Sequence, residues 1–246
     1  MSRDMQEAAF ERMIVVGDLH GYRDPLLRLL DKIAIGDGDL VVFIGDYVDR
    51  GPDSKALVGA LMEFGAAHEN TVFLKGNHED MLLGSIGMPA LIQDVDTWFH
   101  NGGVQTLVSY GAEENEISAL PGIWDLDERS ERARSFIPES HVAFFTSLEL
   151  YVETESYFIC HAGVSPFGTV EEGKRNVFDL LWMRDHLHAD APDWEKTVVC
   201  GHTPQRKVLV REKLICVDTG LYYYGMLSAI DLLSRKIFKV RRGDAA

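Results

Sequence analysis

A cluster of charged side chains directly follows an apolar stretch of the chain. The sequence FIGDYVDRGPD, residues 43–53, places Asp46, Asp49, Arg50 and Asp53 after the apolar run at 40–45. Carboxylates at the rim of a core need partners, because an unpaired buried charge is costly. The partner could be a metal ion, an arginine or water, so this stretch marks a candidate polar site.

Four other polar loops also begin where an apolar run ends. In α/β sheets, ligands bind outside the carboxyl ends of the strands, so such loops can converge on one site. A single Gly-Asp turn is usually structural, and so is a lone histidine. Five such turns together favour a shared site. The loops are GDLHG (17–21), GDYVDRG (45–51), GNHED (76–80), HAG (161–163) and GHTP (201–204).

The side chains in these loops are typical metal ligands. Carboxylate oxygens, imidazole nitrogens and an amide oxygen suit Mn, Fe or Zn better than soft, thiol-seeking ions. Two ions roughly 3.5–4 Å apart can activate a water and hold a phosphoryl group. We therefore expect two divalent ions, with Mn as the first choice and Fe or Zn as alternatives. The candidate ligands are Asp18, His20, Asp46, Asn77, His161 and His202.

The elements that must position these loops alternate between strand and helix in the first third of the chain. Apolar runs at 13–17, 40–45 and 71–76 predict strands. Helical spacing of leucines predicts a helix from Pro25, with Asp24 as its cap, and a second helix over 54–67. Strand, helix, strand, helix, strand is typical of βαβ units and a parallel sheet.

The rest of the chain does not continue the alternation of strands and helices. Residues 81 to about 145 predict a helical insertion over one edge of the core, including a charged, solvated helix at 125–136. No Pro/Gly/Ser-rich linker flanks this segment, so we expect one domain over residues 1–246. Short strands then resume from 148 onwards, separated by short turns, which predicts an antiparallel or mixed second half.

Composition excludes several classes of partner. A formal net charge of -15 over 246 residues argues against a broad nucleic-acid or anionic-membrane surface. An anionic substrate would need local positive charge from an arginine or a metal. Three cysteines without a CxxC pair predict buried free thiols. The first residues carry charges where a signal peptide needs an apolar run, so we expect a cytoplasmic protein.

The motifs GDLHG, GDYVDRG and GNHE, followed by the histidines of HAG and GHTP, resemble the phosphoprotein phosphatase family of calcineurin-like metallophosphoesterases. Their order and spacing are similar to those of short bacterial Ser/Thr phosphatases, over residues 13 to about 233. The resemblance implies an α/β fold in which two mixed β-sheets pack as a sandwich flanked by helices. It also implies a dinuclear metal site at the strand ends.

The resemblance also implies a role for each metal ligand. Asp18 and His20 would bind the first ion, and Asp46 would bridge the two ions. The coordination of the second ion would be completed by the remaining candidates, Asn77, His161 and His202.

The catalytic roles come from the same resemblance. His78 would be the general acid that protonates the leaving alkoxide, oriented and kept charged by Asp49. Arg50 would hold the phosphate oxygens, and Arg184 in LLWMRD matches a second phosphate-binding arginine. A helix-surface charge is the alternative for Arg184. The tyrosines of LYYYG (221–225) either line the substrate cleft or pack against a strand.

Three functions fit these residues. The first is a metal-dependent serine/threonine protein phosphatase, in which a metal-bridging water attacks a phosphoprotein or phosphopeptide. The alternative is a symmetrical bis(5'-nucleosyl)-tetraphosphatase. That relative lacks the second aspartate of the GDxxDRG turn, so Asp49 favours the phosphatase. The third is a silent phosphate-binding scaffold, which would have no need of the acid His78. The oligomeric state stays open.

Overall fold

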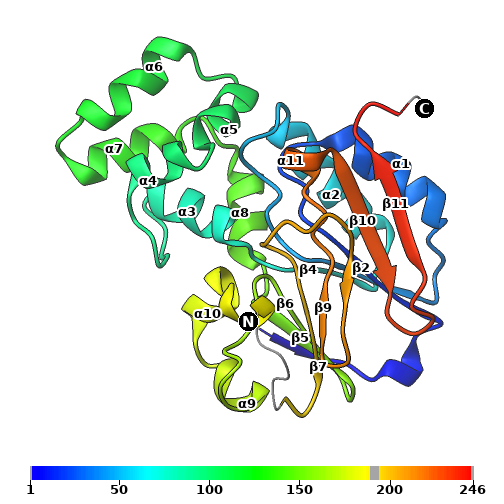
Figure 1. Ribbon diagram of the computed structural model, residues 1–246. Helices are drawn as coiled ribbons and strands as arrows, with labels where there is room; N and C mark the ends of the chain where they lie inside the picture. The colour runs from blue at the N-terminus through cyan, green and yellow to red at the C-terminus, as the bar shows by residue number, and fades with distance from the viewer. Residues whose placement is uncertain (1, 189–193, 245–246) are drawn as a thin grey trace.

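Two β-sheets packed against each other form the centre of the computed structural model, and helices cover their outer faces (Figure 1). The structure describes residues 2–188 and 194–244. The predicted α/β sandwich of two mixed sheets is confirmed.

Within the described residues, one sheet has five strands in the order β11-β10-β2-β3-β4. The three parallel strands at its centre and edge are joined by helices, as the alternating pattern predicted. Strand β10 lies antiparallel to β2 and to β11. The elements are β2 (Arg12–Val16), α1 (Arg23–Ile33), β3 (Asp39–Phe43), α2 (Ser54–Ala67), β4 (Thr71–Phe73), β10 (Met226–Asp231) and β11 (Ile237–Arg241).

The other sheet has six strands in the part of the chain that the structure describes, in the order β1-β5-β6-β7-β9-β8. It is mixed, because β6, β7 and β9 run parallel while β5 and β8 are antiparallel to their inner neighbours. The strands are β1 (Ser2–Asp4), β5 (Tyr151–Glu153), β6 (Tyr157–Cys160), β7 (Thr197–Cys200), β8 (Leu209–Val210) and β9 (Leu214–Cys216). Short helices lie between or beside them, namely η1 (Glu7–Ala9), α9 (Val170–Gly173), α10 (Val177–Trp182), η3 (Asp185–His188) and α11 (Leu221–Tyr224).

The core between the sheets follows from the two-residue period of the strands. Val15 and Val42 of one sheet pack with Ile159 and Val199 of the other. The alternate residues point to the opposite face, where residues such as Phe43 pack against helices. The three cysteines are buried in these strands as free thiols.

The two crossover helices differ in how they begin. Helix α2 begins after Asp53, whose Oδ1 accepts a hydrogen bond of 3.2 Å from the backbone N–H of Ala56. Helix α1 begins at Arg23, so the expected cap at Asp24 is wrong. Asp24 lies within the first turn, where its negative charge is favourable near the helix N-terminus.

The segment between β4 and β5, residues 77–147, consists of helices joined by turns and by a longer irregular stretch at 86–94, and we call it the helical insertion. It forms the green and teal group of helices beside the sheets in Figure 1. Its helices are α3 (Asn77–Ser85), α4 (Val95–His100), α5 (Gly103–Tyr110), α6 (Glu114–Ala119), η2 (Leu120–Gly122), α7 (Leu126–Arg134) and α8 (Glu139–Ser147). Helix α7 is solvated as predicted, with Ala133 as its buried residue. The single-domain expectation stays a prediction.

None of the helices in the described ranges has the length and apolarity needed to cross a membrane.

Candidate active site and metal centre

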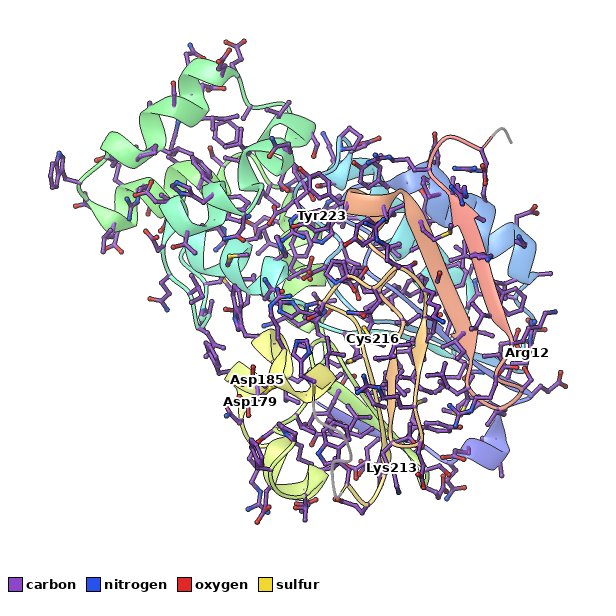
Figure 2. The ribbon with its side chains drawn as sticks, viewed as in Figure 1. Arg12, Asp179, Asp185, Lys213, Cys216 and Tyr223 are labelled. Atoms are coloured by element: carbon purple, nitrogen blue, oxygen red, sulfur yellow. The ribbon has the colours of Figure 1, made fainter. Side chains whose placement is uncertain are left out.

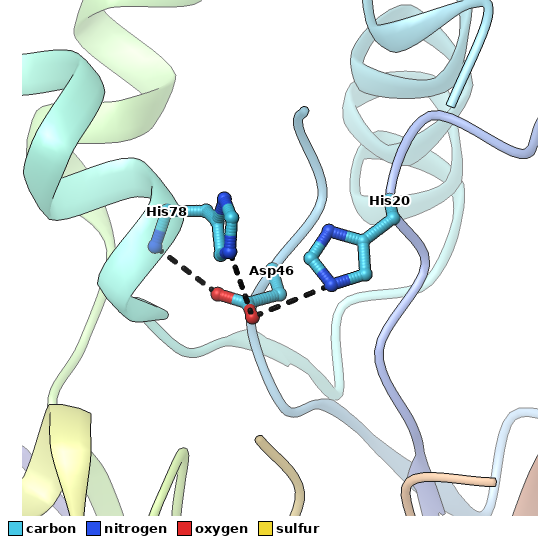
Figure 3. A group of neighbouring side chains, drawn as sticks. All are labelled: His20, Asp46 and His78. Carbon is cyan, nitrogen blue, oxygen red and sulfur yellow. Dashed lines mark hydrogen bonds and ion pairs between the residues drawn. The ribbon is translucent and has the colours of Figure 1, made fainter. Parts of the chain in front are cut away.

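The predicted metal ligands of the strand-end loops converge around Asp46. The Oδ2 atom of Asp46 lies 3.6 Å from Nε2 of His20, and its Oδ1 atom lies 3.3 Å from Nε2 of His161. Figure 3 shows Asp46 between His20 and His78. Within the described ranges, two groups bring possible ligand atoms within 4.8 Å of one another: His20, Asp46 and His78, and Asp46, His161 and His202.

The other two predicted ligands lie at the margins of this cluster. Oδ1 of Asn77, at the start of α3, is 3.0 Å from Nε2 of His161. The carboxylate of Asp18 accepts a hydrogen bond of 3.0 Å from the backbone N–H of His202. Both side chains are buried, but Asp18 lies in neither group of closely spaced ligand atoms. The division of the ligands between two ions stays a prediction.

The imidazoles are oriented for binding a cation. Nδ1 of His20 donates to the Val48 carbonyl at 3.0 Å, and Nδ1 of His161 donates to the Ile44 carbonyl at 2.9 Å, which turns each Nε2 toward Asp46. Burial lowers the pKa of His20, His161 and His202, which favours the neutral form that binds metals. Nε2 of His202 is buried without a hydrogen-bond partner among the described residues. This donor set fits divalent cations.

The buried carboxylates of the site also suit the binding of divalent cations. Burial raises the pKa of Asp18, and the nearby Asp218 and Asp46 raise it further. Burial raises the pKa of Asp46 too, but surrounding imidazoles, led by His161, outweigh burial and lower it. Burial, with Asp46 nearby, raises the pKa of Asp218 to about 7. Asp218 was not among the predicted site residues, because a VDTG turn carries little signal by itself.

The loops at the site have strained backbones. Five non-glycine residues there have φ between 45° and 71°: His20, Asp46, Asp49, Arg50 and His202. Such conformations cost on the order of 1–3 kcal/mol each and persist where the surroundings fix them.

Glu79 of the GNHED motif holds the backbone of the turn around Asp46 in place. Its carboxylate accepts hydrogen bonds from the backbone N–H groups of Asp46, Tyr47 and Gly76, at 2.9, 2.8 and 2.9 Å. Burial and the charge of Asp46 raise the pKa of Glu79 to about 7. Gly76 is required for close approach, since a Cβ there would lie 2.1 Å from Oδ1 of Asp46. Glu79 was not among the predicted site residues.

The predicted acid His78 contacts its predicted partner. Nδ1 of His78 lies 2.6 Å from Oδ2 of Asp49, and both side chains are buried. Nε2 of His78 has no hydrogen-bond partner among the described residues and faces Oδ2 of Asp46 at 3.9 Å. The Asp49 carboxylate also accepts hydrogen bonds from Nε1 of Trp98 and Oγ1 of Thr106, at 2.9 and 2.6 Å. These two residues come from the helical insertion and were missed by the sequence analysis.

The two predicted arginines flank the metal ligands. Nη1 of Arg50 is 2.9 Å from Nε2 of His20. Arg184 lies after α10, outside the helix, and donates to Oγ1 of Thr203 at 3.1 Å. Both arginines line a cavity of about 240 Å³ together with His202. Arg184 is therefore part of the site's rim, which favours the phosphate-binding interpretation over a helix-surface charge.

The tyrosines of α11 line the site on the side of the helical insertion. A second cavity, of about 370 Å³, lies between α11 and the α4–α5 turn, and Arg50, Phe99, Tyr222 and Tyr223 are among its lining residues. The guanidinium of Arg50 lies 5.9 and 5.6 Å from the ring centroids of Tyr222 and Tyr223. Figure 2 shows Tyr223 on the side of α11 near the helical insertion. Of the two alternatives for these tyrosines, lining the cleft fits better.

Comparisons with known proteins identify the family and agree with the fold. A profile of the calcineurin-like phosphoesterase family matches residues 11–236, and the chain belongs to that family. The asymmetrical bis(5'-nucleosyl)-tetraphosphatase PrpE of Halalkalibacterium halodurans is 26% identical over 241 residues, 88% of each chain. Serine/threonine-protein phosphatase 2 of Salmonella typhimurium is 26% identical over 236 residues, 92% of this chain and 94% of the relative. A solved structure of a proposed diadenosine tetraphosphatase, 22% identical, covers 99% of both chains with a TM-score of 0.68.

Proposed function

We propose that this calcineurin-like phosphoesterase hydrolyses phosphoserine and phosphothreonine monoesters in proteins. The observation that carries the proposal is the buried pair of His78 and Asp49. The imidazole of His78 directs Nε2, which has no hydrogen-bond partner among the described residues, toward Asp46. A seryl alkoxide is a strong base and leaves readily only when it is protonated. A phosphate leaving from an anhydride is a weak base and needs less help, so a built-in acid favours esters of alcohols.

The remaining residues fit this reaction. When two divalent ions are bound, they activate water and neutralise charge on the phosphoryl group. Arg50 and Arg184, on the rim of one cavity, would bind the phosphoryl oxygens and stabilise the charge that grows in the transition state. Mn is the expected metal, with Fe or Zn as alternatives. The ions would be held by Asp18, His20, Asp46, Asn77, His161 and His202.

The test compares a phosphoserine peptide with diadenosine tetraphosphate, in parallel, on metal-stripped protein titrated with Mn²⁺. We expect metal to restore activity and the peptide to be the better substrate by kcat/KM. Preference for the dinucleotide would overturn the proposal in favour of the second candidate below. No turnover of either substrate with Mn²⁺, Fe²⁺ or Zn²⁺ would overturn both and leave a phosphate-binding scaffold.

The second candidate is a dinucleoside tetraphosphatase, which the aromatic cavity beside Arg50 favours. Exposed rings such as Tyr222 and Tyr223 can stack on nucleobases, and the similarity to PrpE points to the same substrate class. PrpE is named as asymmetrical, whereas the alternative expected from the sequence was symmetrical cleavage. Products separate the two modes, because symmetrical cleavage yields two ADP and asymmetrical cleavage yields ATP and AMP. In this candidate, Tyr222→Ala raises KM for the dinucleotide and leaves KM for the peptide unchanged.

A further inference from the structure

The carboxylate of Asp49 is enclosed by three side-chain donors. Asp49 has no exposed surface, and its Oδ2 lies 2.6 Å from Nδ1 of His78. Nε1 of Trp98 donates to Oδ1 at 2.9 Å and lies 3.1 Å from Oδ2. Oγ1 of Thr106 donates to Oδ1 at 2.6 Å. Two of the three donors therefore come from α4 and α5 of the helical insertion.

The hydroxyl of Thr106 also holds the backbone of the same turn. Its Oγ1 accepts a hydrogen bond of 2.8 Å from the backbone N–H of Asp49. Because its single proton goes to the Asp49 carboxylate, Oγ1 acts as the acceptor from the hydroxyl of Ser54, 3.2 Å away. The left-handed backbone of Asp49, with φ of 71°, is thus fixed by a residue 57 positions later in the chain.

We propose that Trp98 and Thr106 are positioning residues for the acid step, acting on His78 through Asp49. This inference rests on the proposed role of His78 as the acid. With Oδ1 bound by the two insertion residues, the carboxylate cannot rotate, and Oδ2 stays on Nδ1 of His78. An acceptor at Nδ1 fixes one proton there, so the proton donated to the leaving alkoxide comes from Nε2, which stays aimed into the metal ligands.

The physical reason is that a buried carboxylate needs all of its donors. Losing one of them leaves a buried acceptor unsatisfied, and the carboxylate turns to recover a partner. That movement breaks the hydrogen bond between Oδ2 of Asp49 and Nδ1 of His78, and the imidazole can then rotate or exchange tautomers. The consequence is a poorer proton donor with little change at the phosphate-binding arginines. The backbone N–H of Asp49 keeps Oγ of Ser54 as an acceptor at 3.2 Å, and neither Arg50 nor Arg184 shares a hydrogen bond with Trp98 or Thr106 in the described ranges.

The experiment uses a matched pair of substitutions at one position. Thr106→Val keeps the shape of the side chain and removes the hydroxyl, whereas Thr106→Ser keeps the hydroxyl and removes a methyl group. Trp98→Phe removes the other donor. Each protein is assayed with Mn²⁺ on a phosphoserine peptide and on p-nitrophenyl phosphate, whose leaving group is a weak base and depends little on an acid.

We expect Thr106→Val and Trp98→Phe to lower kcat on the phosphoserine peptide about 10-fold and kcat on p-nitrophenyl phosphate less than about 3-fold, with KM little changed. Thr106→Ser should restore most of the peptide activity. In a His78→Asn background, Thr106→Val should have no further effect, because the group that it positions is already gone. Melting temperature and bound metal, measured for every variant, identify any protein that is misfolded or underloaded.

An equal fall on both substrates in Thr106→Val and Thr106→Ser would overturn the inference and assign Thr106 a packing role. A second readout does not depend on activity: ¹⁵N NMR of metal-free protein should show His78 protonated at Nδ1 in the wild type and mixed tautomers in Thr106→Val. If His78→Asn leaves kcat on the phosphoserine peptide unchanged, the assignment of His78 as the acid fails. The NMR result then still decides whether Thr106 fixes the imidazole.

Discussion

The strand-end loops and the outer part of the helical insertion are built in opposite ways. The loops bury their charged side chains and hold left-handed backbones at residues such as Asp46 and Asp49. The outer helices α6 and α7 expose theirs, and the connection between them leaves the Trp124 side chain 97% exposed. Of the seven non-glycine residues with left-handed backbones in the described ranges, five lie in the loops that carry the candidate chemistry, and the other two are Ala34 and Arg235.

The inner part of the helical insertion belongs with the loops rather than with its own outer helices. Trp98 and Thr106, on α4 and α5, are fully buried and complete the hydrogen bonds of Asp49. The boundary of the site thus runs through the insertion, between α5 and α6. The following experiments test where that boundary lies, from the largest expected effect to the smallest.

His78→Asn should give the largest effect inside the site. Removing a general acid lowers kcat on the order of 10² to 10⁴. The bound metal should stay the same, because the resemblance assigns His78 to proton transfer and not to ligation, although His78 lies within one of the groups of closely spaced ligand atoms. Steady-state kinetics and metal analysis on the same samples check this. Loss of metal would make His78 a ligand, and an unchanged kcat would remove it from the reaction.

Gly102→Ala and Gly111→Ala form a matched pair across the proposed boundary. Both glycines have left-handed backbones, with φ of 105° and 100°, so each substitution costs about 1 kcal/mol or more in folding free energy. A Cβ at Gly102 would lie 2.6 Å from the backbone nitrogen of Arg50, whereas Gly111 has open space around it. We expect Gly102→Ala to lower the melting temperature more than Gly111→Ala, because its Cβ also meets backbone atoms, and to raise KM roughly 10-fold, whereas Gly111→Ala should leave KM unchanged. Equal kinetics would separate the α4–α5 turn from the site.

Asp218→Asn tests the electrostatics of the loops without metal. Burial raises the pKa of Asp218 from its ordinary value of 3.8 to about 7. Between those values the folded protein holds a proton that the unfolded chain has lost, so the wild type loses stability as pH rises through this window. Asparagine removes that dependence. The melting temperature of metal-free Asp218→Asn, relative to the wild type, should therefore be higher at pH 8 than at pH 4. A constant difference would contradict the raised pKa.

Arg132→Ala should give the smallest effect, because it lies on the outer side of the boundary. Its guanidinium pairs with Glu116 at 3.2 Å on the surface, and such pairs contribute little. The free energy of unfolding should change by less than about 0.5 kcal/mol in denaturant titration, and kcat/KM should not change. A loss of activity would extend the site into α6 and α7.

Local pattern was enough to predict the strands from β2 onwards, the crossover helices and the loops that carry the candidate ligands, whereas β1 (Ser2–Asp4) was not predicted. Each of these features depends on a short stretch of sequence. Strands follow from two-residue alternation, helices from the spacing of leucines, and the loops from polar motifs at the ends of apolar runs. The start of α1 was predicted wrongly, at Pro25 with Asp24 as the cap instead of at Arg23, because helix ends depend on a few contacts at the terminus rather than on the run itself.

By itself, the sequence determined the family, the sandwich of mixed sheets and which residue types gather at the strand ends. Only the tertiary structure decided that Trp98 and Thr106 complete the environment of Asp49, that Glu79 holds the turn around Asp46, and that Asp218 is buried nearby. The reason is physical. Motifs arise from neighbours along the chain, whereas the hydrogen bonds that fix a buried carboxylate join residues 49 and 57 positions apart, and those pairings exist only after the helices pack.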